Sequence, residues 1–299
     1  MEIRRLNRKI LDNYNTILMT VTLSLVLITP VAMLVILGYK SSTLLQEHSI
    51  FRLLFTSAWE PGRGNFGFLA FILGSISITI LSVLIAGPIC LLTALYLTQY
   101  ASEKLVRTMQ PIIDILAGIP SVVYGVWGIL VIVPFISNVI APHFNVQTTG
   151  YTLIAGGIVL AVMIIPFILN ILIEIFRTIP LELTEATLSL GATRWEVVKH
   201  VLVRKAKPGI ISAFGLGISR AFGETIAVLM VAGNVARIPN GLFDPVYPLP
   251  ALIANNYGEM MSIPLYDSAL MMSALILFMA ILVFNFFSRV SIYRLERNL

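Results

Sequence analysis

The segment TIPLELTEATLSLGATRWEVVKHVLVRKAKPG, residues 178–209, interrupts a chain that is otherwise mostly apolar. In it or directly before it lie six of the twenty Lys and Arg residues, together with three glutamates. Gly191 can take a backbone conformation that other residues resist, which predicts a turn between two short helices. Thr178 is placed to cap the first helix, Pro180 suits its first turn, and Glu182 lies near the positive end of its dipole. We name residues 178–209 the polar segment and predict a helix, a turn and a helix outside the bilayer. By composition alone, an amphipathic helix resting on lipid headgroups fits equally well.

The composition around the polar segment is that of a membrane protein. Of the 299 residues, 58% are hydrophobic and only 12% are charged, whereas about 25% are charged in soluble domains. The net charge of +5 is explained by cationic loops that remain on the cytoplasmic side. The sequence therefore predicts an integral membrane protein with a lipid bilayer as its surroundings and no nucleic acid as its partner.

Several classes of chemistry lack the residues that they need. The single cysteine, Cys90, lies in an apolar stretch and has no intramolecular disulfide partner, and three scattered histidines give no metal-ligand spacing. No GxxxxGK[ST] motif occurs, so any nucleotide that drives the protein is bound by another chain. Ser121, beside Pro120, is explained by helix geometry. The sequence shows no pair of a nucleophile and a base that would indicate an enzyme. We expect no catalytic residue, no metal and no cofactor bound by this chain.

Six nearly uncharged stretches are each long enough to cross about 30 Å of hydrocarbon. The predicted spans are residues 16–39, 66–102, 115–137, 151–173, 209–233 and 266–288. Fifteen Lys or Arg residues fall in the connections on one side and four on the other, and Arg220 lies inside the fifth span. This bias places both termini and the polar segment in the cytoplasm.

The spans divide the chain into three parts. Residues 1–65 hold a cytoplasmic tail, the first span and an outside loop, which is long enough for a short helix and a turn at Pro61-Gly62. Residues 66–288 form the core with its cytoplasmic loop at 178–208, and residues 289–299 form a second cytoplasmic tail.

Two charged residues lie inside the fifth span. Arg220 and Glu224 are four residues apart, which predicts one shared helix face. Such charges cost about 2.5 to 3.5 kcal/mol each at bilayer depth, so they line a pathway or pair with one another. We expect Arg220 to meet an anionic solute, because guanidinium matches phosphate-like oxyanions with paired donors, while Glu224 competes for it and keeps binding weak. The alternative is a salt bridge that only neutralises two charges between packed helices.

The third span carries the other irregular stretch. Its sequence AGIPSVVYGVWGILVIVP, residues 117–134, contains two prolines and three glycines. Backbone groups freed by proline in lipid must be satisfied by neighbours or face a cavity. Pro120 and Ser121 are therefore predicted at a kink, which either lines the pathway or is a passive bend.

The polar segment resembles a known loop. The triplet EAT at 185–187 is followed after three residues by Gly191 and after nine more by Val201. This spacing is similar to the cytoplasmic coupling loop of ABC importer permeases, written EAA, three residues, G, nine residues, I, one residue, LP. The chain departs from that pattern in having Thr for the second Ala of the triplet and VR at 203–204 for the closing LP.

Three further stretches narrow the resemblance. They are SAWEPGRGNFG at 57–67, AGIPSVVYGVWGILVIVP at 117–134 and SRAFGETIAVLMVAGN at 219–234. Together with the loop, they make nearly the whole chain resemble the PstC-type permease subunit of the phosphate ABC importer. The tryptophan-containing outside loop and the VLMVAGN ending separate this subunit type from its sister permease.

The resemblance implies an all-α membrane protein with the type I ABC importer permease fold, a five-helix core plus an N-terminal helix. It implies a location in a bacterial-type cytoplasmic (inner) membrane. Its partners would be a sister permease in a heterodimer, two ATPase subunits that use ATP, and an extracytoplasmic binding protein that delivers phosphate. Glu185, Ala186 and Gly191 would belong to the part that seats on the ATPase. Arg220 and Glu224 match the family's intramembrane charged pair.

Rival functions remain open at this point. A permease for molybdate or sulfate would share the coupling loop but would not be expected to share the stretch at 219–234. A proton-coupled anion carrier would use Glu224 as its proton site and would transport without ATP. An intramembrane enzyme would need hydrolysis of a substrate by the isolated chain.

Overall fold

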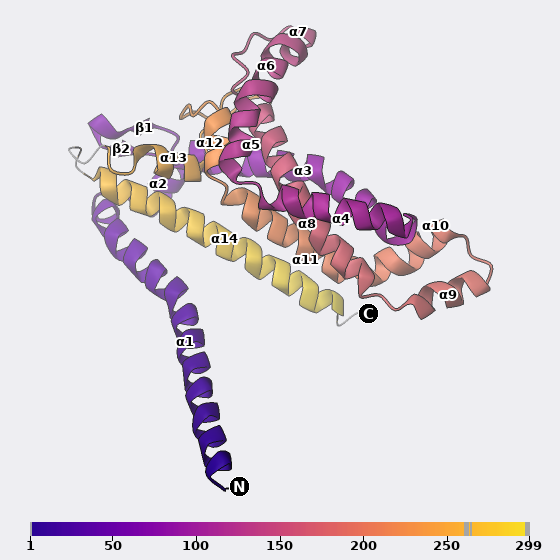
Figure 1. Ribbon diagram of the computed structural model, residues 1–299. Coiled ribbons are helices and arrows are strands. Elements are labelled where there is room, and N and C mark those ends of the chain that lie inside the picture. The colour runs from indigo at the N-terminus through magenta and orange to yellow at the C-terminus, as the bar shows by residue number, and fades with distance from the viewer. Residues whose placement is uncertain (1, 260–262, 264, 297–299) are drawn as a thin grey trace.

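The computed structural model describes residues 2–259, 263 and 265–296, and the described chain is mostly helical (Figure 1). The long helices are α1 (Glu2–Glu47), α3 (Leu69–Gln99), α4 (Glu103–Gly118), α8 (Leu153–Arg177), α11 (Val203–Phe222) and α14 (Tyr266–Glu296). The short elements are α2 (Ile50–Phe55), β1 (Trp59–Glu60), η1 (Pro61–Arg63), β2 (Asn65–Phe66), α5 (Ser121–Trp127), η2 (Gly128–Ile132), α6 (Val133–Phe135), η3 (Ile136–Ile140), α7 (Ala141–His143), α9 (Leu181–Ser189), α10 (Arg194–Glu196), η4 (Val197–Leu202), α12 (Ile226–Val231) and α13 (Leu249–Asn256). The prediction of an all-helical membrane protein is confirmed.

Five stretches of the described chain are long and apolar enough to cross a bilayer. They are Asp12–Glu47, Leu69–Gln99, Ser121–His143, Leu153–Arg177 and Tyr266–Tyr293. These correspond to predicted spans one, two, three, four and six. The predicted fifth span is absent from this set because it is divided between α11 and α12 by a break at residues 223–225.

The core forms where α3 and α8 lie against each other and α11 packs on both (Figure 1). Membrane helices gain little from burying apolar surface away from lipid, so close packing has to hold them together. Gly157 of α8 permits this approach, because a Cβ there would lie 2.5 Å from Cδ2 of Leu81 on α3. Helix α14 lies along α11 and connects the core to α1.

Helix α1 extends away from this core and packs mainly on α14 (Figure 1). Its side chains from Asp12 to Pro30 are exposed to the surroundings of the single chain. Helix α14 reaches Glu296, so the predicted tail at 289–299 begins inside a helix. Residues 297–299, and 260–262 and 264 of the predicted loop at 234–264, lie outside the described residues.

One end of the bundle carries a small aromatic platform. The two-stranded antiparallel ladder β1–β2 follows the short helix α2, and η1 makes the turn at Pro61-Gly62, as predicted. Trp59 packs on Phe71 of α3, with ring centroids 5.0 Å apart. The backbone N–H of Leu249 on α13 donates to Oγ of Ser75, 2.8 Å away on α3. The polar segment lies at the opposite end, so the bundle has two chemically distinct ends (Figure 1).

Two predicted boundaries in the third span and its approach are wrong. The span was expected at residues 115–137, but the helix that crosses begins at Ser121 and runs to His143. The connection between the predicted second and third spans, residues 103–114, lies in the amphipathic helix α4, which Ser102 caps through the N–H of Leu105. The apolar residues before Pro120 suggested an earlier start, whereas the chain breaks at the proline.

Candidate functional site

Arg220 lies in the last turn of α11, at the point where the helix ends. Its guanidinium carbon lies 4.7 Å from the ring centroid of Phe167 on α8, which places the cation over the aromatic face. Such contacts are worth about 0.5 to 2 kcal/mol and hold the planar group without consuming all of its N–H donors. Arg220 is exposed on the surface of the single chain, so its donors remain available to a solute or a second subunit.

Glu224 lies beyond the end of α11, which corrects the prediction of one shared helix face. Helix α11 stops at Phe222, and Glu224 precedes α12. Its Oε1 accepts a hydrogen bond from the N–H of Ala227 at 3.3 Å, so the carboxylate serves the first turn of α12. Among the described residues, none of the ion pairs joins Arg220 to Glu224.

Pro120 separates α4 from α5, and Ser121 is the first residue of α5. Proline has no N–H to give to the carbonyl of Leu116, four residues back. The hydroxyl of Tyr124 donates to that carbonyl at 2.8 Å, and the N–H of Ile119 donates at 3.3 Å. The predicted kink is therefore a complete break with its backbone satisfied. Helix α5, which follows the break at Pro120, packs against α12, which follows the break at residues 223–225.

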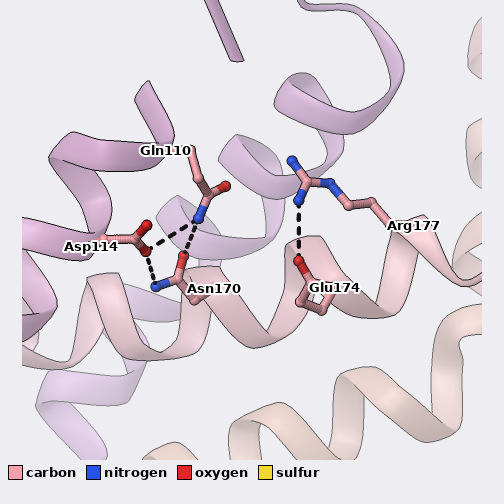
Figure 2. Close-up of polar contacts among 5 residues, drawn as sticks. All are labelled: Gln110, Asp114, Asn170, Glu174 and Arg177. Carbon is pink, nitrogen blue, oxygen red and sulfur yellow. Dashed lines mark hydrogen bonds and ion pairs between the residues drawn. The ribbon is translucent and has the colours of Figure 1, made fainter. Parts of the chain in front are cut away.

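Three polar side chains meet between α4 and α8 (Figure 2). Nε2 of Gln110 donates to Oδ1 of Asn170 at 3.0 Å and to Oδ1 of Asp114 at 3.3 Å, and Nδ2 of Asn170 donates to the same Asp114 oxygen at 3.0 Å. We name Gln110, Asp114 and Asn170 the amide–carboxylate cluster. One turn further along α8, Arg177 and Glu174 form a separate ion pair of 3.1 Å (Figure 2).

The polar segment folds as two short helices around a turn. Glu185 and Ala186 lie on α9 and are exposed, and α9 has no buried residue. Gly191 takes a φ of +86°, the left-handed region that glycine enters without steric cost, so the predicted turn is confirmed. After the turn, Val198 and Leu202 are buried against the core.

Capping in the polar segment differs from the prediction in two respects, at Thr178 and at Pro180. Thr178 does not cap α9, because its hydroxyl donates to the carbonyl of Ile175 at 2.8 Å and it ends α8 instead. Pro180 takes the N-cap position of α9 without a side-chain hydrogen bond, and Glu182 lies in the first turn as predicted. The capped helix is the second one, where Thr193 and Glu196 form a capping box.

This capping box also affects the ionisation of Glu196. The N–H and the hydroxyl of Thr193 each donate to Oε2 of Glu196 at 2.8 Å. These hydrogen bonds lower the pKa of Glu196 from its ordinary value of 4.5, and the bond from the backbone N–H contributes more than the bond from the hydroxyl. A carboxyl with a lowered pKa stabilises the folded state above its ordinary pKa, and this contribution is lost as pH falls through the lowered value.

We expect Thr193→Ala to loosen the start of the second helix in the polar segment. Removing an N-cap hydroxyl costs about 1 kcal/mol, which is about fivefold in the local opening equilibrium. Amide hydrogen exchange at Val197 and Val198, corrected for intrinsic rates, should speed up by that factor at pH 7. The difference from the natural chain should narrow as pH is lowered through the pKa of Glu196. Exchange that is unchanged at pH 7 would contradict the role of the box.

The sequence did not indicate two parts of this arrangement. Asn170 is a single amide in an apolar span, and only its polarity at bilayer depth marked it as a residue with a partner. Its partners Gln110 and Asp114 lie 60 and 56 residues earlier in the chain. The break before Glu224 also went unpredicted, because residues 226–231 continue the apolar stretch.

Comparison with known proteins identifies the family. Residues 88–299 match the family described as "Binding-protein-dependent transport system inner membrane component". The chain is 34% identical over 303 residues to the phosphate transport system permease protein PstC of Xylella fastidiosa, covering 96% of this chain and 92% of the relative. It is 35% identical over 315 residues to a probable PstC protein of Methanocaldococcus jannaschii, covering 99% and 97%.

Solved structures show the same fold at low sequence identity. A chain of the MetNI methionine ABC transporter in an inward-facing conformation aligns with a TM-score of 0.53 at 22% identity, covering 74% of this chain and 93% of that one. A chain of a bacterial ABC transporter involved in the import of alginate aligns with a TM-score of 0.56 at 16% identity, covering 76% and 79%. The protein is therefore a multi-pass membrane permease of the binding-protein-dependent transport system inner membrane component family, homologous to PstC permeases, with the type I ABC importer fold.

Proposed function

We propose that this chain moves inorganic phosphate across the cytoplasmic membrane as one permease subunit of an ATP-driven importer. The observation that carries the proposal is the position of Arg220, which lies at the end of a core helix, stacked on Phe167 and without a carboxylate partner among the described residues. A guanidinium in this setting offers paired donors to a tetrahedral oxyanion. The phosphate permeases among the relatives support the choice of phosphate over molybdate or sulfate.

The two ends of the bundle support the proposed partners. Helix α9 and the turn at Gly191 present an exposed surface with Leu190 88% accessible, which suits a cleft on an ATPase subunit that hydrolyses ATP. The β1–β2 ladder and α13 at the opposite end suit an extracytoplasmic phosphate-binding protein. A sister permease completes the pathway as a heterodimer, and two ATPase subunits serve the pair. Both termini lie in the cytoplasm with the polar segment.

The mechanism assigns different tasks to the two charged residues. Arg220 receives phosphate released by the binding protein, and its guanidinium compensates the charge of the anion in a medium of low dielectric constant. Glu224 is half-buried and lies just before α12, four residues after Arg220. Its negative charge keeps the anion from being held too tightly. Closure of the ATPase moves α9, and α8 and α11 carry that motion to the two helix breaks.

The test is phosphate uptake by vesicles that contain the chain with its candidate sister permease, ATPase and binding protein. We expect uptake only with ATP on the ATPase side and binding protein on the other. Uptake driven by a proton gradient without ATP would overturn the importer and support a carrier based on Glu224. ATP-dependent uptake of sulfate or molybdate in preference to phosphate, with cognate binding proteins, would overturn the choice of solute.

A further inference from the structure

The amide–carboxylate cluster has polar atoms left over after its internal hydrogen bonds. Both hydrogens of the Gln110 amide are used, and Oδ1 of Asp114 accepts from both amides. Within the described chain, Oδ2 of Asp114, Oε1 of Gln110 and one N–H of Asn170 have no hydrogen-bond partner. The cluster therefore offers two acceptors, one of them anionic, and one donor.

Asn170 of the cluster lies inside the membrane-spanning helix α8, and Gln110 and Asp114 contact it from α4. Asn170 is seven residues before the end of α8 at Arg177, which is about 10 Å at 1.5 Å per residue. The side chain of Asp114 is exposed on the single chain, and a carboxylate facing lipid costs about 2.5 to 3.5 kcal/mol. Its exposed side is therefore expected to face an aqueous pathway or a second subunit.

The position along α8 points to the pathway. Asn170 lies three residues after Phe167 and thus on the same helix face, one turn closer to the polar segment. Phe167 is the ring on which Arg220 is stacked. An anion that leaves Arg220 toward the cytoplasm along this face passes the cluster next.

We infer that the amide–carboxylate cluster is a second solute station, which admits oxyanions that carry a hydroxyl and rejects fully ionised ones. Inorganic phosphate keeps at least one P–OH group at neutral pH, and this hydroxyl donates to Asp114 while the free N–H of Asn170 donates to a phosphoryl oxygen. Sulfate has no hydroxyl at neutral pH, so it can accept from Asn170 but cannot donate to Asp114, and its negative charge is repelled by the carboxylate. The inference rests on the proposed phosphate transport and names the residues that select the protonation state of the solute.

A purely structural role predicts something different. The cluster joins α4 to α8 and would then act only as a clamp between them. Loss of a clamp lowers stability or assembly but does not change which anions compete. Anion selectivity is therefore the readout that separates the two roles.

The experiment measures initial rates of ATP-driven phosphate uptake with competing anion placed inside the vesicles. Interior anion reaches the cluster without passing the binding protein, whose own selectivity would otherwise hide that of the permease. For the natural chain, interior phosphate should inhibit at concentrations at least tenfold lower than interior sulfate at matched ionic strength. In Asp114→Asn, sulfate should inhibit within about twofold of phosphate, because an amide carries no charge. Asp114→Glu should retain the exclusion of sulfate.

Glu174→Gln is the matched control. It removes one negative charge from the same face of α8 but lies outside the cluster. Equal loss of selectivity in Glu174→Gln and Asp114→Asn would reduce the effect to general electrostatics and overturn the inference, as would unchanged selectivity in Asp114→Asn. Asp114→Asn gives no result if it does not copurify with its partners. The test is then the natural chain and Asp114→Glu, and equal inhibition by sulfate and phosphate in either of them overturns the inference. A natural complex without ATP-driven phosphate uptake would instead refute the proposed function.

Discussion

Arg220→Gln is expected to lower ATP-driven phosphate uptake about 100-fold while the protein still inserts and assembles. Glutamine keeps one neutral donor group but removes the charge and the second parallel N–H. Hydrogen bonds to charged groups contribute about 1.5 to 3 kcal/mol, and about 2.7 kcal/mol corresponds to 100-fold. The contact with Phe167 adds little to this loss, because it orients the guanidinium and does not bind the solute.

Two further variants make this result specific. Arg220→Lys keeps the charge but loses the planar fork, so uptake should fall about tenfold. Glu224→Gln retains an oxygen that accepts the N–H of Ala227, so α12 keeps its first turn and only the negative charge is lost. Uptake should be measured in vesicles with interior ATP and normalised to permease content. Arg220→Gln transporting at the natural rate would reduce Arg220 to a structural residue stacked on Phe167.

Local physics made most of the helices predictable. The length of each apolar stretch predicted that five of the spans exist, though not all of their bounds, and the conformational freedom of Gly191 predicted its turn. The same local rules predicted Pro120 and Ser121 at a kink, since a proline at this depth removes a backbone donor. At each of these positions, the neighbouring residues in the sequence determine the local structure.

The remaining features depend on contacts between distant residues. Arg220 and Glu224 have the spacing of one helix face, but the chain breaks at Gly223 and α12 packs against α5 instead of continuing α11. No pattern at 219–234 indicates this break, because its apolar residues suit either arrangement. Asp114 and Asn170 meet only because α4 folds back onto α8, which a sequence pattern cannot show.

Gly191→Val is expected to reduce coupled phosphate uptake about 30-fold. A β-branched residue at φ +86° is strained, and the left-handed conformation costs a residue other than glycine about 2 kcal/mol, which corresponds to about 30-fold. A Cβ at Gly191 would meet no atom within 4 Å, so the loss comes from the backbone and not from a clash. The turn would relax and move α9 away from the position in which it seats on the ATPase.

The measurement compares uptake with ATP hydrolysis in the same vesicles. Stimulation of hydrolysis by phosphate-loaded binding protein should fall together with uptake, while basal hydrolysis by the ATPase subunits persists. Gly241→Val is the control, because a Cβ added at this glycine would also meet no atom within 4 Å, and its φ is not positive. Equal uptake by Gly191→Val and Gly241→Val would show that coupling does not depend on the turn at Gly191. The contact with the ATPase would then have to depend on a surface that tolerates a displaced α9, such as the exposed Trp195 beyond the turn.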